Sequence, residues 1–128
     1  MTPPSLSFTG REIDVMAVLW DRGPSTVAEV RATIADPLAY TTVLTILRTL
    51  ETKGHVTHRA EGRAHRYRAL VTRDAAAGAE LGRLLGPFFG GSAAKLVERL
   101  ARDSTIPTAE LKRMRKSLKK RLRQRDDD

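Results

Sequence analysis

The chain has 128 residues and a mass of 14.2 kDa, enough for one domain or two very small ones. It carries 23 Lys and Arg residues against 15 Asp and Glu residues, so we expect an acidic partner, nucleic acid before an anionic membrane surface. No apolar run approaches the roughly 20 residues of a membrane span, and the first ten residues do not resemble a signal peptide. The absence of cysteine excludes disulfides, thiolate metal sites and cysteine nucleophiles, and it suits a cytoplasmic protein.

The positive charge is concentrated in two stretches. Nine basic residues and no acidic residue lie between Lys112 and Arg125, and we interpret this run as a solvated helix face. The second stretch, residues 59–68, holds four arginines and one acidic residue. The three histidines lie in or beside it, and we interpret them as surface residues near a phosphate-facing loop, because two histidines facing each other without a third ligand make a weak zinc site. They are His55, His58 and His65.

Two capping boxes predict the first two helices. Thr9 is followed three residues later by Glu12, and Thr26 is followed at the same spacing by Glu29. Gly23-Pro24 separates the two helices. The first helix is expected to bury one stripe at helical spacing, formed by Ile13, Met16, Ala17 and Trp20.

The third helix is predicted from about Tyr40 to Lys53, with Gly54 as its C-terminal stop. At about 100° per residue, one side is apolar and the opposite side carries threonines and an arginine. Threonine is a mediocre helix former, so this composition points to more than a solvated face. Short hydroxyl side chains let a helix approach DNA closely and contact phosphates, base edges or thymine methyl groups. The apolar side holds Val43, Ile46, Leu47 and Leu50; the polar side holds Thr41, Thr45, Arg48 and Thr52, flanked by Thr42 and Thr49.

After Gly54 the pattern becomes extended. Residues 55–60 and 64–70 bracket Glu61-Gly62-Arg63, which predicts a β-hairpin with a glycine turn. Helix, short helix, threonine-rich helix and basic hairpin is the order of a winged helix-turn-helix, in which the third helix enters the major groove and the hairpin wing lies along the backbone. We therefore predict a mainly α fold with a small β-hairpin, and a winged helix-turn-helix DNA-binding domain over residues 6–72.

Residues 73–128 are predicted to form three helices that make a helical dimerisation region. The first is expected to end at Gly86-Pro87, which leaves Phe88-Phe89 in a loop as a dimer contact or a ligand pocket. The second is expected to begin near Ser92 and the third near Pro107. None would be stable alone in water, so their apolar stripes should pack against a second copy of the chain. The expected dimer contacts are Leu96, Leu100, Leu111, Met114, Leu118 and Leu122.

Three segments resemble the BlaI/MecI/CopY family of bacterial transcriptional repressors, the penicillinase repressors. They are EIDVMAVLW at Glu12–Trp20, AYTTVLTILRTLETKG at Ala39–Gly54 and GRAHRY at Gly62–Tyr67. The resemblance is strong from about Thr9 to Leu70, and beyond that it lies in the helix layout. It implies a homodimer whose winged helix-turn-helix binds a palindromic operator in double-stranded DNA and represses by occupying the promoter.

The resemblance also implies site residues. Carried onto this sequence, the recognition positions are Thr41, Thr42, Thr45 and Arg48, and the wing positions are Arg63, His65 and Arg66. We expect the two wing arginines to hold phosphates rather than read bases. The β-lactam-responsive members are cleaved at an Asn-Phe bond where this chain has Arg99-Leu100, and the copper-responsive members carry a cysteine motif that this chain lacks. The resemblance therefore implies repression and leaves the inducing signal open.

Two other functions stay open from the residues alone. One is a non-specific architectural DNA-binding protein that uses the basic C-terminal helix. The other is a protein whose basic helix binds an anionic membrane or a partner, although that helix lacks Trp and Phe on its apolar side. The sequence has no glycine-rich phosphate loop, no helical His-x-x-x-His pair and no serine in a nucleophile elbow, so we predict no enzyme activity, metal or cofactor.

Overall fold

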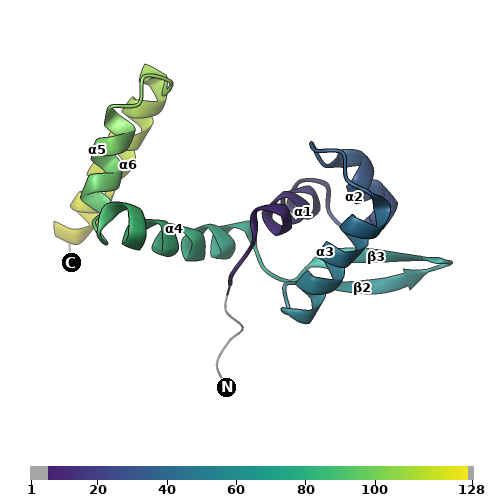
Figure 1. Cartoon of the computed structure of the whole chain (residues 1–128). Coiled ribbons are helices and arrows are strands. Elements are labelled where there is room, and N and C mark those ends of the chain that lie inside the picture. Colours follow the sequence, from purple (N-terminus) through teal and green to yellow (C-terminus); the bar gives the residue numbers. More distant parts are fainter. Residues whose placement is uncertain (1–5, 127–128) are drawn as a thin grey trace. The chain divides into compact units, whose positions relative to one another are not determined.

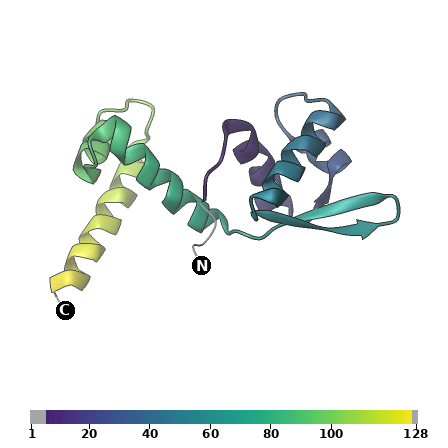
Figure 2. The same cartoon turned by 60° about the horizontal axis from the view of Figure 1, so that its bottom comes forward.

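The computed structural model describes residues 6–126 and divides the chain into two compact units, Met1–Gly82 and Arg83–Asp128. The six helices of residues 6–126 and the strands β2 and β3 are labelled in Figure 1, and Figure 2 shows the same elements from a second direction. The boundary between the units falls inside the helix α4 (Arg73–Phe89), and each unit is described by itself. The division predicted between residues 72 and 73 stays a prediction.

The first unit combines helices with a three-stranded antiparallel sheet. Its elements before α4 are α1 (Gly10–Arg22), β1 (Ser25–Thr26), α2 (Val27–Thr33), α3 (Tyr40–Thr52), β2 (Val56–Glu61) and β3 (Ala64–Ala69). Strand β3 lies between β1 and β2, and the far end of the β2–β3 hairpin extends beyond the helices (Figures 1 and 2). The mainly helical fold with a small hairpin is thus confirmed, and β1 is an element that the sequence did not predict.

Both predicted capping boxes are present. The Thr9 hydroxyl accepts from the backbone N–H of Glu12 at 3.2 Å, and the Glu12 carboxylate accepts from the backbone N–H of Thr9 at 2.8 Å. Thr26 and Glu29 make the same reciprocal pair at 3.2 and 3.0 Å. Glu12 is buried and also accepts from the ammonium of Lys53 at 2.7 Å, which ties the start of α1 to the residue that follows α3.

The stripe predicted for α1 is only partly right: Met16 is buried and Trp20 packs against the core, but the stripe is wrong at Ile13. Ile13 is 36% exposed, whereas Val15 and Leu19 are buried together with Met16 and Val18. Helix α1 is apolar over more than half of its circumference, so its periodicity alone does not select one face. The face that it buries is chosen by its neighbours, because α1 contacts α2, α3 and β3.

The interpretation of His55 as a surface residue is also wrong. His55 has no exposed surface, and its ring lies 4.7 Å from the ring of Phe8. Its backbone N–H donates to the carbonyl of Leu50 and its carbonyl accepts from Leu70, so the chain turns inward between α3 and β2. Burial and the nearby charge of Lys53 lower the pKa of the imidazole below its ordinary value, while the carboxylate of Glu12 opposes this shift.

The second unit contains the end of α4, followed by α5 (Ala93–Ala101) and α6 (Thr108–Asp126). The predicted stop at Gly86-Pro87 is wrong, because α4 continues to Phe89 and Phe88 lies in the helix rather than in a loop. Pro87 removes a single hydrogen-bond donor in the last turn. The helix ends where Gly90 and Gly91 adopt positive φ of 57° and 79°, and the Gly91 N–H donates to the Leu85 carbonyl.

The predicted start of the next helix is confirmed, since the Ser92 hydroxyl accepts from the backbone N–H of Lys95 at 3.2 Å. Across residues 6–126, no helix has the length and apolar character that crossing a bilayer requires.

Burial of His55 predicts a pH-dependent stability of the first unit. Because its pKa is lower in the folded than in the unfolded chain, the unfolded chain binds a proton that the folded chain does not as pH falls through about 6.5. We expect the free energy of unfolding, measured with urea, to fall as pH is lowered from 7 to 5. His55→Gln should flatten this decline. An equal decline in the wild type and His55→Gln would contradict the assignment.

Candidate nucleic-acid interface

Helix α3 has two opposite faces, as predicted. Val43, Leu47 and Leu50 have no exposed surface and anchor the helix in the core, and Ile46 packs partly against it. The opposite face is exposed and holds the predicted recognition positions together with two further threonines. These exposed residues are Thr41, Thr42, Thr45, Arg48, Thr49 and Thr52.

Three threonine hydroxyls on this face are hydrogen-bonded to their own helix. Thr45 donates to the carbonyl of Thr41 at 2.9 Å, Thr49 to that of Thr45 at 3.0 Å, and Thr52 to that of Arg48 at 3.1 Å. The hydroxyl hydrogen is therefore used inside the helix. What these side chains offer outward is a methyl group and oxygen lone pairs, which suit a thymine methyl group and the amino groups of adenine and cytosine.

The β2–β3 hairpin forms a wing with a two-residue turn. Glu61 pairs with Ala64, and the turn is Gly62-Arg63, with Gly62 at a φ of +62° that glycine adopts without strain. Arg63 therefore lies exposed at the tip of the wing. Side chains alternate between the two faces of the strands, so His65 and Arg66, both predicted to contact DNA, lie on opposite faces.

Arg66 joins the wing to the start of α2. Its guanidinium donates to both carboxylate oxygens of Glu61, to Glu29 at 3.0 Å and to the carbonyl of Pro24 at 3.1 Å. Glu29 also accepts from Arg22 at the end of α1. The hydrogen bonds that Arg66 donates to Glu61 first, and then the charges of both carboxylates, raise the pKa of Arg66 against the opposing effect of burial. The N–H donors of the Arg66 guanidinium are thus used in hydrogen bonds to other groups of the protein.

The opposite face of the wing carries an aromatic cluster. The rings of His58 and His65 stack with centroids 4.3 Å apart, and His58 also lies 5.2 Å from the buried ring of Tyr67. His58 Nδ1 lies 2.7 Å from a carboxylate oxygen of Glu51 in α3. This contact links strand β2 of the wing to the last turn of α3. His65 stacks on the histidine that makes the contact.

Two arginines that were not among the predicted site residues share a face with Arg66. Arg59 is the cross-strand partner of Arg66, and Arg68 is the partner of Thr57. Both are exposed and form no ion pair within residues 6–126. With Pro24 and Thr57 they line a hollow of about 350 Å³. The alternation of side chains along a strand could have predicted both positions. Arg68 lies two residues after Arg66 in β3, and Arg59 lies directly opposite Arg66 in β2.

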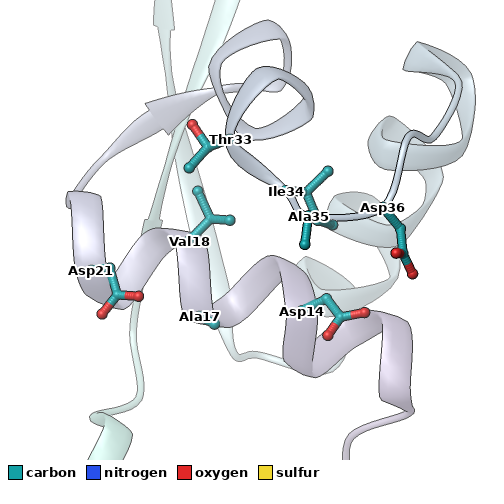
Figure 3. A pocket seen from close by; sticks show the side chains of 8 residues that line it. All are labelled: Asp14, Ala17, Val18, Asp21, Thr33, Ile34, Ala35 and Asp36. Atoms are coloured by element: carbon teal, nitrogen blue, oxygen red, sulfur yellow. The ribbon is translucent and has the colours of Figure 1, made fainter.

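A second hollow, on the α1 side of the same unit, is acidic. It has a volume of about 440 Å³, and Figure 3 shows its carboxylates around a floor that includes Val18 and Ile34. Asp14 and Asp36 pair with Arg11, and Asp21 pairs with Arg73. The hydrogen bond from Arg73 lowers the pKa of Asp21, which therefore stays ionised. These carboxylates offer phosphate no favourable contact, so within the first unit we place the candidate interface on α3 and the wing.

The contacts of Arg66 predict a structural role that Arg63 does not share. Arg66→Gln should lower the urea midpoint of unfolding, because Glu29 and Glu61 lose a cation that both contact. Arg63→Gln, at the exposed tip, should leave the midpoint unchanged. Glu29→Gln should act like Arg66→Gln, and the double variant should fall by less than the sum of the two, as coupled residues do. Additive effects would contradict the coupling.

Comparison with known proteins identifies the family. The family model of the penicillinase repressor matches residues 8–120. No curated protein matches the chain. A mutant MarR from E. coli aligns over 91% of this chain and 79% of its own, at 20% identity and a TM-score of 0.52. BpsR of Bordetella bronchiseptica, whose DNA binding is regulated by 6-hydroxynicotinic acid, aligns over 99% and 81%, at 20% identity and a TM-score of 0.48. A MarR family protein from Bacillus stearothermophilus aligns over 74% and 71%, at 22% identity and a TM-score of 0.48.

These findings agree with the fold and with the three sequence segments. The likeness to MarR supports the winged helix-turn-helix architecture and nothing finer. The family match covers most of both units and agrees with the resemblance found in the sequence. The chain therefore belongs to the penicillinase repressor family, and it is a transcriptional repressor that binds DNA through a winged helix-turn-helix.

Proposed function

We propose that the chain represses transcription as a homodimer that binds a palindromic operator, with α3 in the major groove and the wing along the backbone. The observation that carries this proposal is the phase of α3. Val43, Leu47 and Leu50 are fully buried while its threonines and Arg48 are exposed, so the polar face is free for a ligand. Two such helices, related by a twofold axis, would meet half-sites about 10 base pairs apart, centre to centre.

Within this proposal the residues of α3 read bases. Arg48 is exposed and forms no ion pair within residues 6–126, so its guanidinium is available to the O6 and N7 acceptors of a guanine. Thr41, Thr42 and Thr45 supply methyl groups at close range. Their short side chains let the helix backbone approach the groove.

The wing contacts the phosphate backbone of the DNA. Arg63 at the tip, with Arg59 and Arg68 on one face, contacts phosphates without reading sequence. His65 lies on the other face of the hairpin, where its ring stacks on that of His58, and it contributes to the contact of the wing with the DNA backbone. Arg66 supports the wing through Glu29 and Glu61, so we assign it a positioning role in place of the phosphate contact expected from the sequence.

The second unit supplies the dimer contact. No residue of α5 or α6 is buried in the single chain, and Leu118 and Leu122 are 51% and 63% exposed. An apolar groove of about 260 Å³ runs along the two helices; Leu96 and Leu100, two of the dimer contacts expected from the sequence, are half-buried and do not line it. A second copy is the simplest cover for such a stripe. The apolar side chains that line the groove are Val97, Ala101, Leu111, Met114, Leu118 and Leu122.

The base-reading role of α3 predicts a loss of specificity without a loss of stability. Arg48→Ala should leave the urea midpoint unchanged and lower the preference for operator over scrambled duplex by about 1–3 kcal/mol if it contacts a base. Leu47→Ala should instead destabilise the unit by about 2–5 kcal/mol through a core cavity. The operator is obtained by footprinting upstream of the chain's own coding region. Full discrimination by Arg48→Ala would contradict the assignment.

Thr45 offers a matched pair of substitutions that separates its methyl group from its hydroxyl. Since the hydroxyl hydrogen is bonded to Thr41, we expect Thr45→Val to retain operator preference and Thr45→Ser to lose part of it. Affinities for operator and scrambled duplex, measured by fluorescence anisotropy, give the two ratios. The reverse order would show that the oxygen is the group that reads the base.

The dimer contact predicts that one charge in the groove separates the copies. Leu118→Asp should give monomers in sedimentation at micromolar concentration, because a carboxylate would be buried without a partner at a cost of several kcal/mol. Ser117→Asp is the matched control, since this exposed neighbour does not line the groove and should stay dimeric. A monomeric wild type would refute the dimer.

A further inference from the structure

Helix α6 carries a row of cations on the side opposite its apolar stripe. At 100° per residue, the four apolar residues that face the groove gather on one side, and five basic residues lie between about 80° and 120° away from the nearest of them. All five are exposed. We call this row the outer stripe: Lys112, Arg113, Lys116, Lys120 and Arg123.

The outer stripe is not neutralised by the protein. Within residues 6–126, the one ion pair that α6 makes joins Arg113 to Glu110 at 3.2 Å, and the Arg113 side chain is 78% exposed. Lys112 and Lys116, and likewise Lys116 and Lys120, stand four residues apart, where like charges repel and destabilise a helix. A helix that only meets solvent usually alternates the signs of its charges. The arrangement therefore suits a polyanion that supplies the missing negative charge.

We propose that the outer stripe of α6 binds the phosphate backbone of duplex DNA without reading its sequence. From Lys112 to Arg123 the stripe spans about 17 Å of helix, and duplex DNA carries one charge for about every 1.7 Å of its axis. Several phosphates can thus face one helix. This contact goes beyond operator reading by α3 and the wing, and it requires no particular base.

The same helix argues against a lipid surface. A helix that lies on a membrane inserts an apolar face, usually with Trp or Phe, between the head groups. The apolar side of α6 has Leu and Met but no aromatic residue, and it already lines the groove with Val97 and Ala101 of α5. Only the cationic side remains for an external partner, and cations alone suit phosphates in water.

The test is the salt dependence of DNA binding by the full chain. Lys116→Gln, Lys120→Gln and Arg123→Gln, combined, remove three charges and keep good helix formers. Each lost phosphate contact should lower the slope of log affinity against log salt by about 0.9, so we expect a decrease of about 2.7 per chain. The decrease should be the same on operator and on scrambled duplex, because the stripe does not read sequence.

The control keeps the charge and changes the side chains. Lys116→Arg, Lys120→Arg and Arg123→Lys, combined, should keep the wild-type slope. An unchanged slope in the glutamine variant would overturn the proposal. So would loss of binding to phosphatidylserine vesicles by that variant with its slope on duplex DNA intact, since the stripe would then serve a membrane. Failure of operator recognition would appear differently, as a lost preference for operator over scrambled duplex with the slope effect retained.

Discussion

Val43, Leu47 and Leu50 fix the rotation of α3 about its own axis, and the surface that the protein can offer to DNA follows from that rotation. All three are fully buried against α1, α2 and the sheet. Turning the helix would expose leucine side chains, each worth roughly 2 kcal/mol or more of burial, and would carry polar side chains into an apolar core. The threonine face therefore points outward, because the apolar face on the other side of the helix must stay in the core. The hydroxyls of Thr45 and Thr49 then donate to carbonyls of the same helix.

Two capping carboxylates position the elements around this helix. Glu12 caps α1 and also pairs with Lys53, the residue just after α3. Burial alone would raise the pKa of Glu12, but the hydrogen bonds from Lys53 and Thr9 lower it. Glu29 caps α2 and also holds Arg66 of the wing, and the backbone hydrogen bond from Thr26 lowers its pKa. Both glutamates are therefore ionised at neutral pH. One local motif thus serves twice, first to start a helix and then to orient a distant element.

Features set by neighbouring residues in the sequence were predictable, and those set by distant partners were not. The capping box at Thr9, the turn at Gly62 and the two faces of α3 depend on spacings of a few residues. Strand β1 has two residues and exists because it pairs with β3, about forty residues later. The burial of His55 depends on Phe8, and the pairing of Arg66 depends on Glu29, 37 residues away. Local spacing carries no signal for these contacts, so the core side of α1 and the role of Arg66 needed the structure.

The orientation of α3 can be observed directly by methyl NMR of the full chain, titrated with an operator duplex selected from a random pool. We expect the methyl resonances of Thr41, Thr42 and Thr45 to shift on binding, while those of Val43 and Leu47 stay near their free positions. A scrambled duplex should shift the threonine methyls less. Binding that leaves these threonine resonances in place, and moves only residues of the wing or α6, would contradict the central claim that α3 is the helix that reads the operator.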